Sequence, residues 1–372
     1  MAMNVLVTGG AGFVGSHTAD ALLRHGDHVR VFDNLSPQVH PNGLPPYLTS
    51  EIEFVKGDVR DLAAVTRAVR GMDVIYHFAA AVGVGQSMYE IADYAAVNVQ
   101  GTANLLQAIL NTRMHPKKLV VASSMSIYGE GRYLCPQCGE VEPQARGLSQ
   151  LKKQDWEIHC PQCGGIVTPI PTDEAKPQQC TSIYALSKKM QEDMVLLFGQ
   201  TYSVPAVAFR YFNIYGTRQS LSNPYTGVAA IFASRLLNGN PPLLFEDGAQ
   251  LRDFVSVHDI VQANLLALES SHADGMAMNV GSGKQISVSE VATHIASALG
   301  TTTASAITGK YRAGDIRHCF ADTSLISQVL GYRPRVNFRE GVNELVQWLR
   351  SQEAEDQAEE AFEHLTTRGL VA

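Results

Sequence analysis

Short apolar runs rich in β-branched residues alternate with amphipathic segments through the first 211 residues. The runs predict strands, and the segments in which apolar residues recur every three or four positions predict helices. The expected strands are Met3–Thr8, His28–Phe32, Ile52–Val55, Asp73–Phe78, Lys118–Ala122 and Pro205–Arg210, and the expected helices are Phe13–His25, Leu62–Val69, Tyr94–Leu110 and Ser182–Phe198. Because parallel neighbours need long crossover connections, this alternation predicts an α/β fold, a doubly wound parallel sheet with helices on both faces.

The pattern is less regular after residue 215. Helices are expected at Gly227–Leu237, His258–Glu269, Val288–Leu299 and Arg339–Leu349, with short strands such as Met278–Val280. We expect a doubly wound (Rossmann) domain, a smaller C-terminal lobe, an inserted ribbon and a helical tail with a solvated, weakly apolar face. The expected boundaries are 1–132 and 169–215 for the Rossmann domain, with 255–272 returning to it, 216–254 and 273–350 for the lobe, 133–168 for the ribbon and 351–372 for the tail.

Composition narrows the class of protein. The chain has 372 residues, 45% of them hydrophobic and 17% charged, which is enough to bury a large core. The net charge of −7 offers no basic field for phosphate backbones, so nucleic acid is not expected as a partner. No apolar run approaches the roughly 18 residues of a spanning helix, and no charged leader precedes the first strand. A soluble cytoplasmic protein without a membrane partner is expected.

A glycine-rich turn, Thr8-Gly9-Gly10-Ala11-Gly12-Phe13-Val14-Gly15, joins the first predicted strand to the first predicted helix. Glycines allow the backbone to approach a pyrophosphate, and the helix N-terminus supplies free N–H donors. Asp33, at the end of the second strand, would accept hydrogen bonds from an adenosine ribose and repel a 2′-phosphate, which favours NAD over NADP. Asp58, after the third strand, would meet the adenine or cap the following helix.

Three residues predict the chemistry of the site. Ser124 ends the fifth strand, and Tyr184 and Lys188 lie four positions apart, on one face of a predicted helix. A phenol with a pKa near 10 is a poor base at neutral pH unless a nearby cation stabilises its phenolate. Lys188 and an oxidised nicotinamide would both do so, and the Ser124 hydroxyl would hold the reacting oxygen. The alternative is a surface helix with an incidental Tyr and Lys.

With these motifs in order, the chain resembles the extended short-chain dehydrogenases/reductases, specifically the nucleotide-sugar epimerases and dehydratases. The resemblance runs from about Met3 to Leu349 and is interrupted by the insertion. It rests on the glycine turn and on Asp33-Asn34, Gly57-Asp58-Val59, His77-Phe78-Ala79-Ala80, Ser123-Ser124, Ile127-Tyr128-Gly129, Tyr184-Ala-Leu-Ser-Lys188, Arg210-Tyr211-Phe212-Asn213, Arg252-Asp253-Phe254-Val255 and Gly314-Asp315-Ile316-Arg317.

The resemblance implies a role for each matching position. NAD would contact Gly9, Gly12, Phe13, Val14, Gly15, Asp33, Asn34, Asp58, Val59, Ala79, Tyr184 and Lys188. Ser124, Tyr184 and Lys188 would be catalytic. A nucleotide-diphosphate sugar would contact Val84, Ser124, Met125, Ser126, Tyr184, Asn213, Arg252 and Arg317. The two arginines suit phosphate geometry, and each has an alternative interpretation as a domain-packing salt bridge.

The residues after the catalytic serine discriminate reactions in this family. Dehydratases carry an Asp-Glu pair there, whereas this chain has Met125-Ser126, which leaves dehydration without an acid and a base. The resemblance therefore favours C4 epimerisation by transient oxidation, with a dTDP-6-deoxyhexose such as dTDP-L-rhamnose as substrate. The alternatives are a UDP-hexose or UDP-uronate 4-epimerase, a nucleotide-sugar 4-ketoreductase, and a non-catalytic dinucleotide-sensing scaffold.

Two near-identical cysteine pairs define the insertion. Cys135-Pro-Gln-Cys138 and Cys160-Pro-Gln-Cys163 have the spacing C-x2-C-x21-C-x2-C, which predicts a tetrahedral S4 site. With all four positions filled by protein, the metal would be structural; zinc is expected, iron is possible, and a redox dithiol is the alternative. The resemblance also implies a homodimer through the helices at Tyr94–Leu110 and Ser182–Phe198.

Overall fold

A computed structural model describes residues 2–221, 223, 225, 227–312, 314–352 and 356–371. Its centre is a seven-stranded sheet in the order β13-β9-β5-β4-β1-β2-β3, with all neighbouring strands parallel. The strands are β1 (Asn4–Thr8), β2 (His28–Asp33), β3 (Glu53–Lys56), β4 (Val74–His77), β5 (Lys118–Ser124), β9 (Ala206–Tyr211) and β13 (Ala277–Val280). The predicted doubly wound sheet is confirmed.

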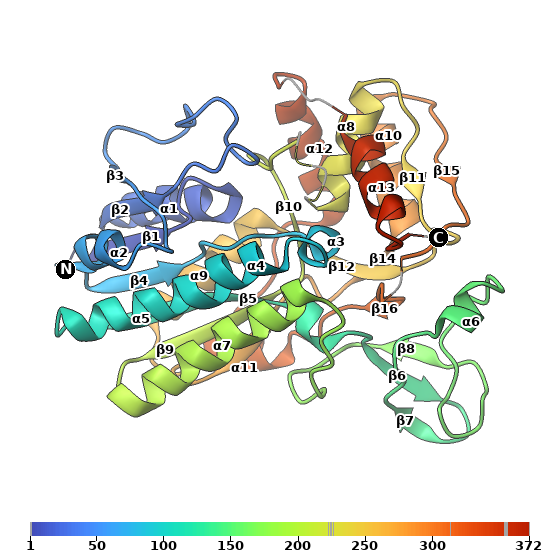
Figure 1. Cartoon of the computed structure of the whole chain (residues 1–372), viewed down its shortest axis with the longest axis horizontal. Helices are drawn as coiled ribbons and strands as arrows, with labels where there is room; N and C mark the ends of the chain where they lie inside the picture. The colour runs from blue at the N-terminus through green and yellow to red at the C-terminus, as the bar shows by residue number, and fades with distance from the viewer. Residues whose placement is uncertain are drawn as a thin grey trace.

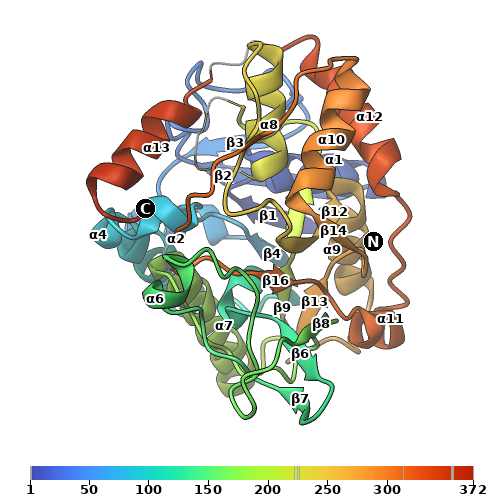
Figure 2. The same cartoon turned by 90° about the vertical axis from the view of Figure 1, so that its right-hand side faces the viewer.

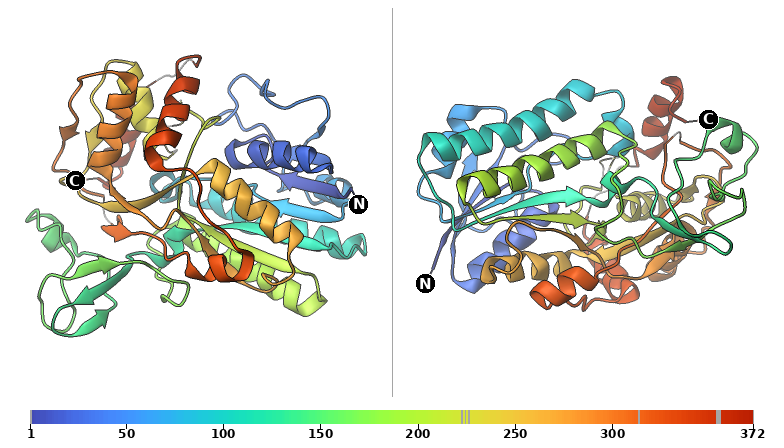
Figure 3. Two further views of the ribbon diagram at one scale, coloured as in Figure 1. Left: turned by 180° about the vertical axis from the view of Figure 1, so that it is seen from behind. Right: turned by 90° about the horizontal axis from the view of Figure 1, so that it is seen from below.

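Helices cover both faces of this sheet (Figures 1 and 3). The right-hand view of Figure 3 shows α5 and α7 on one side and α1, α9 and α11 on the other. The first layer contains α2 (Leu62–Val69), α4 (Ile91–Tyr94), a π-helical segment (Ala95–Gln100), α5 (Gly101–Asn111) and α7 (Ile183–Tyr202). The second contains α1 (Phe13–His25), α9 (Val257–Glu269) and α11 (Ser324–Leu330). Each layer buries its own apolar cluster against the sheet.

The return of the chain to the sheet differs in part from the expected boundaries. Helix α9, within the expected 255–272, packs on the sheet beside α1. The strand that joins the sheet is β13, which pairs with β9 and lies in the range 273–350 assigned to the smaller lobe. Two apolar residues of β13, Met278 and Val280, are fully buried. A strand of four residues carries too little pattern to reveal which sheet it joins.

The smaller lobe has its own sheet and core. Its strands are β10 (Asn213–Tyr215), β12 (Leu251–Ser256), β14 (Gln285–Ser287) and β16 (His318–Cys319), with a separate pair β11 (Leu243–Leu244) and β15 (Ala306–Ile307). Its helices are α8 (Val228–Leu237), α10 (Val288–Leu299) and α12 (Phe338–Leu349), with α3 (Val84–Ser87) nearby. Phe232, Ile295 and Leu345 are among the residues that close its core.

The insertion is a compact ribbon. Strands β6 (Arg132–Cys135), β7 (Gly139–Val141) and β8 (Thr168–Ile170) form an antiparallel sheet, and α6 (Leu148–Leu151) lies in the loop between β7 and β8. Figures 1 and 2 show it projecting from the body of the molecule beside β16. Tyr133, Val141, Ile158 and Val167 are buried around the cysteines, so the ribbon has a small core of its own.

The tail contains α13 (Ala358–Thr367); residues 353–355, part of the expected helix, lie outside the described residues. The apolar face of α13 is packed rather than solvated. Leu365 is buried and lies against Gly85, and the Phe362 ring lies 5.9 Å from the Phe245 ring. Among the described residues, no helix combines the length and the apolar character needed to cross a membrane.

Candidate active site

The glycine turn has the shape that its sequence predicts. Gly9 has a φ of +68°, and a Cβ there would lie 2.7 Å from the Ala79 backbone nitrogen. A Cβ on Gly15 would lie 2.3 Å from the Gly9 carbonyl oxygen, so the helix start lies directly against the turn. Gly12 precedes α1 and offers no side-chain cap. The first-turn N–H groups of α1, from Phe13, Val14 and Gly15, therefore remain available to an anion.

Asp33 lies where the sequence places it, at the end of β2 beside the turn. Its carboxylate accepts a hydrogen bond from the Ala11 N–H at 3.1 Å and one from the Leu35 N–H at 2.9 Å. The Asn34 side chain donates to Asp58 at 3.0 Å. The structure thus brings together the three polar residues predicted at the adenosine end of the site.

Asp58 does not cap a helix. Asp61 is the cap of α2 and accepts from the Ala63 and Ala64 N–H groups. Asp58 instead forms an ion pair with Arg60 at 2.8 Å, and this hydrogen-bonded arginine lowers the pKa of Asp58 to about 2. Its neighbour Val59 is buried against Gly101 at the start of α5.

The predicted catalytic residues come together from two neighbouring elements. Ser124 ends β5, and Tyr184 and Lys188 lie in the first two turns of α7, which packs on β5. Burial raises the pKa of Tyr184, and a hydrogen bond with Ser124 acts in the opposite direction. Lys188 is 3% exposed, and its Nζ donates to Gln191 at 2.8 Å.

Several residues that support this group were not found from the sequence. Gln191 holds Lys188 and donates to Thr102 at 2.9 Å, and Thr102 contacts the buried His77 ring at 2.9 Å. Asn98 donates to Ser187 at 2.8 Å and pairs with the backbone of Ala81. The π-helical segment places Asn98 inward, as such bulges often do at functional sites. In the sequence, Asn98 could have been noticed as a polar residue within an otherwise apolar helical pattern.

Lys188 gives a pH-dependent prediction. Burial lowers its pKa to about 7, so between pH 7 and its usual 10.5 the unfolded chain binds more protons and stability rises with pH. The penalty for burying the ammonium is fully present below pH 7. We therefore expect Lys188→Met to raise the thermal midpoint of NAD-free protein relative to wild type most strongly near pH 6, with the difference shrinking toward pH 10. Calorimetry across this range measures it.

Lys189→Met is the control for that experiment, because Lys189 is the next residue and pairs with Asp193 at the surface. Its effect should be small and nearly independent of pH. If the thermal midpoints of Lys188→Met and wild type differ by the same amount at pH 6 and at pH 10, burial does not destabilise the Lys188 ammonium as proposed.

The residues predicted to contact a nucleotide sugar differ in burial and in the partners that they already have. Met125 and Ser126 are buried directly after Ser124, and Val84 is exposed on α3. Asn213 begins β10, and its buried Oδ1 has no hydrogen-bond partner within the described part of the chain, as expected of an atom that meets a ligand.

Arg252 and Arg317 both lie in the smaller lobe, and each already has partners. The Arg252 guanidinium donates to the backbone carbonyls of Leu251, Ile316 and Arg317. Arg317 is 0% exposed, and carboxylates surround its terminal nitrogens. For Arg317 the structure agrees with the alternative of a packing salt bridge, and its role toward substrate stays a prediction.

The four cysteines of the insertion converge. The Sγ atoms of Cys135, Cys138, Cys160 and Cys163 all lie within 4.8 Å of one another, and those of Cys135 and Cys163 are 3.6 Å apart. Zn–S bonds of about 2.3 Å in a tetrahedron put sulfur atoms about 3.8 Å apart, so the set fits an S4 metal site. The Gln162 N–H points at the Cys160 sulfur at 3.4 Å, as in a turn that presents thiolates.

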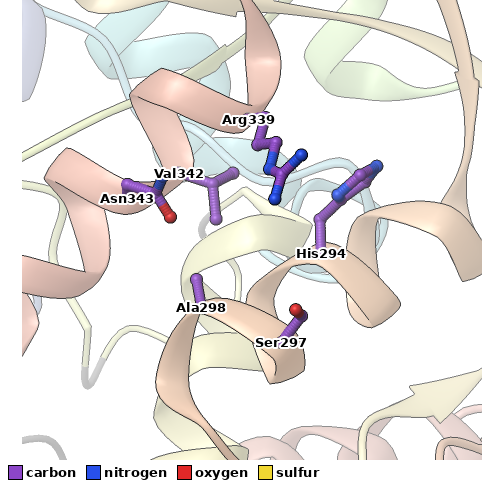
Figure 4. A pocket seen from close by; sticks show the side chains of 6 residues that line it. All are labelled: His294, Ser297, Ala298, Arg339, Val342 and Asn343. Carbon is purple, nitrogen blue, oxygen red and sulfur yellow. The ribbon is translucent and has the colours of Figure 1, made fainter.

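A surface pocket lies elsewhere, between α10 and α12. His294 and Arg339 lie side by side over it (Figure 4). Its lining residues are His294, Ser297, Ala298, Arg339, Val342 and Asn343. None of them belongs to the predicted site.

Two family models match the chain. Residues 5–146 match the family described as NAD dependent epimerase/dehydratase, and residues 164–345 match the family described as GDP-mannose 4,6 dehydratase. The residues between the two matches, 147–163, lie within the cysteine insertion.

Individual relatives cover nearly the whole chain. A dTDP-L-rhamnose 4-epimerase of Burkholderia thailandensis is 34% identical over 93% of this chain and 94% of its own length. A UDP-glucose 4-epimerase of Thermus thermophilus, solved with NAD, is 32% identical with a TM-score of 0.75, covering 94% of this chain and 100% of that one. A UDP-N-acetylglucosamine 4-epimerase of Methanobrevibacter ruminantium, solved with UDP-N-acetylmuramic acid, is 30% identical with a TM-score of 0.76, covering 95% and 99%.

The fold, the glycine turn and the Ser124, Tyr184 and Lys188 group define an extended short-chain dehydrogenase/reductase. The chain belongs to the NAD-dependent epimerase/dehydratase family. The resemblance drawn from the motifs is confirmed, as is the prediction of an enzyme of the NAD-dependent epimerase class.

Proposed function

We propose that the protein is an NAD-dependent nucleotide-sugar 4-epimerase whose substrate is a dTDP-6-deoxyhexose, with dTDP-L-rhamnose as the first candidate. One observation carries the reaction type: the catalytic group contains a hydroxyl, a phenol and an ammonium, and the two buried residues after Ser124 are Met125 and Ser126. Elimination of water needs an acid and a base there. Oxidation and reduction at C4 need only the tyrosine, the lysine and the cofactor.

The residues of the glycine turn and Asp33 fit NAD. Gly12, Phe13, Val14 and Gly15 present the free end of α1 to the pyrophosphate, and the Asp33 carboxylate would accept hydrogen bonds from the adenosine ribose. Lys188 and Tyr184 would face the nicotinamide ribose. NAD held by these residues would supply the hydride chemistry at the sugar C4, as acceptor in one direction and donor in the other.

Side chains of this protein would transfer the proton of the sugar 4-hydroxyl. Tyr184 as phenolate removes the proton of the sugar 4-hydroxyl as the C4–H bond breaks, and it gives the proton back when hydride returns. Lys188, held by Gln191, stabilises the phenolate electrostatically. Ser124 donates to the 4-oxygen and orients it. Atoms and electrons balance over the cycle, so no net redox change occurs.

We base the choice of sugar on the relatives and on the segment Ala81–Ser87, which we expect to border the sugar. The relative from Burkholderia thailandensis is named for dTDP-L-rhamnose, whereas the two solved relatives described above are named for UDP sugars. The segment Ala81–Ser87 has small apolar residues that suit a 6-deoxy sugar better than a uronate. A UDP-hexose 4-epimerase is therefore the second candidate.

Product analysis separates these candidates. Purified enzyme is incubated with dTDP-L-rhamnose, UDP-glucose and UDP-glucuronate in parallel, and products are followed by proton NMR. We expect inversion at C4 of dTDP-L-rhamnose. Conversion of a UDP sugar alone would reject the rhamnose assignment, and stoichiometric consumption of NADH or NADPH with a 4-keto sugar would identify a ketoreductase.

The cysteine cluster is proposed to hold one structural zinc ion. Four thiolates from two turns leave no open coordination position, so the metal stabilises the ribbon and does no chemistry. Plasma mass spectrometry of freshly purified, reduced protein should find about one equivalent of zinc per chain. Iron in place of zinc would change the metal but keep the site, and less than about half an equivalent of any metal would reject it.

The protein is proposed to form a homodimer in the cytoplasm through α5 and α7. Their outer faces expose Leu110 (37% exposed), Leu186 (46%) and Leu197 (64%). Large apolar side chains left exposed on neighbouring helices suit an interface with a second copy of the chain. Light scattering that gives the mass of one chain would reject the dimer.

A further inference from the structure

The ribbon docks on the smaller lobe through buried charges. Arg146, in the loop before α6, has a side chain that is 2% exposed. Its two terminal nitrogens donate to the Glu246 carboxylate at 2.9 and 2.8 Å, and they also reach the carbonyls of Trp156 and Asp315. Glu246 belongs to the lobe and is 1% exposed. A buried bidentate pair of this kind fixes both partners in orientation.

Arg317 continues the same network. Its terminal nitrogens donate to Glu246 at 2.9 Å, to both Asp247 oxygens at 2.7 and 2.9 Å, and to Glu157 of the ribbon at 2.5 Å. Glu246 therefore bridges Arg146 and Arg317. Removing one partner from a buried charge network leaves an uncompensated charge, so the ribbon and the lobe depend on each other here.

The chain enters the ribbon at residues 130–131 and leaves it at residue 172, and these two stems also hold the segment 315–320 around Arg317. The Gly131 N–H donates to the His318 carbonyl at 2.8 Å, and the Thr172 N–H donates to the Phe320 carbonyl at 2.8 Å. The Glu130 carboxylate accepts from the Arg317 N–H at 2.8 Å. The ribbon and its stems therefore set the position of this segment.

That segment in turn places Arg252. The Arg252 guanidinium donates to the carbonyls of Ile316 and Arg317 at 2.5 and 3.0 Å, and its backbone pairs with Cys319. Arg252 and Arg317 are the two residues predicted to meet a diphosphate. Both are oriented by groups that the ribbon holds.

The cysteine cluster lies close in sequence to Glu157, the ribbon residue that pairs with Arg317. Glu157 precedes Cys160 by three residues, and Ile158 between them is 2% exposed in the ribbon core. Four ligands from two turns fix this stretch of backbone when the metal is bound. Loss of the metal would free the segment that carries Glu157 and Trp156.

We propose that the cysteine ribbon is a positioning element for the nucleotide-sugar site: through Arg146 and Glu157 it fixes Glu246, Arg317 and Arg252, so that the bound metal controls affinity for a nucleoside diphosphate. The identity of this ligand rests on the proposed function. Glu157 and Arg146 are positioning residues, because they act through the lobe and touch neither the reacting atoms nor NAD.

The test combines hydrogen exchange with binding. Zinc is removed from reduced holoprotein with a chelator, and peptides covering residues 246–252 and 315–319 are followed by mass spectrometry. We expect exchange in both to become about tenfold faster or more, with the core strands β1 and β5 unchanged. By calorimetry, metal removal and Glu157→Gln should each weaken dTDP or UDP binding about tenfold and leave NAD affinity within about twofold.

Glu140→Gln is the matched control, since Glu140 lies in the same ribbon and pairs with Arg132 at its surface. It should change neither exchange nor affinity. Unchanged exchange at 246–252 and 315–319 after complete metal removal would overturn the proposal. Tighter dTDP binding by Glu157→Gln would also overturn it, because Glu157 would then compete with the phosphate. If neither nucleotide binds the holoprotein, the proposed function fails and the exchange result alone decides the coupling.

Discussion

Replacing Tyr184 with phenylalanine should lower kcat by about 10²- to 10⁴-fold, because the phenol is the group that moves the proton of the sugar 4-hydroxyl in the proposed mechanism. The ring still fills its place against Tyr94, whose ring lies 6.5 Å away. The thermal midpoint should therefore change little. Steady-state kinetics on the substrate identified by NMR, with the thermal midpoint measured on the same sample, gives the comparison.

Tyr202→Phe is the control for this variant. Tyr202 ends the same helix, α7, and is 44% exposed, so loss of its hydroxyl should leave kcat unchanged. Near-normal turnover of Tyr184→Phe would contradict the assignment of Tyr184 as the base. A large fall in the thermal midpoint together with the loss of activity would point to a structural effect instead.

Replacing Gly15 with alanine should disrupt both the fold around the turn and NAD binding. The added Cβ would lie 2.3 Å from the Gly9 carbonyl oxygen and 2.6 Å from the Gly10 Cα, both of them backbone atoms that cannot rotate away. Overpacking of this kind costs about 1–3 kcal/mol. We expect the thermal midpoint of NAD-free protein to fall by about 5 °C and NAD affinity to fall by at least about 100-fold.

Gly12→Ala separates the two effects. The nearest backbone atom to its added Cβ is the Gly9 oxygen at 3.3 Å, so the NAD-free protein should melt within about 2 °C of wild type. Its Cβ would occupy the side from which a pyrophosphate approaches, and NAD affinity should still fall. Calorimetry with and without NAD measures both. Equal NAD affinity in Gly12→Ala and wild type would contradict the location of the pyrophosphate site.

Local patterns predicted the first βαβ unit nearly to the residue. The observed β1, α1 and β2 start and end within one residue of the predicted Met3–Thr8, Phe13–His25 and His28–Phe32. Each boundary has a local cause, such as the glycine turn or Gly26, whose φ of +96° ends α1. The placement of Asp33, Tyr184 and Lys188 on their elements was predictable for the same reason, and their roles toward NAD and substrate stay predictions.

Features that depend on distant partners were not predictable. The membership of β13 in the main sheet depends on pairing with β9, about seventy residues earlier, and no local pattern encodes it. The carboxylates around Arg317 come from the lobe and from the ribbon, so a motif that suits phosphate could not reveal that its guanidinium is already paired. The sequence marks Asn98 only as a polar residue within an apolar helical pattern, and the π-helical segment that turns it inward is seen only in the structure.

In the proposed mechanism, hydride leaves C4 and returns to the same carbon without escaping the site. The decisive experiment uses dTDP-L-rhamnose deuterated at C4, incubated with enzyme and catalytic NAD in ordinary water and followed by NMR. We expect a C4-inverted product that keeps its deuterium, with no net accumulation of NADH. Loss of the label to solvent, or a dehydrated 4-keto product, would contradict it.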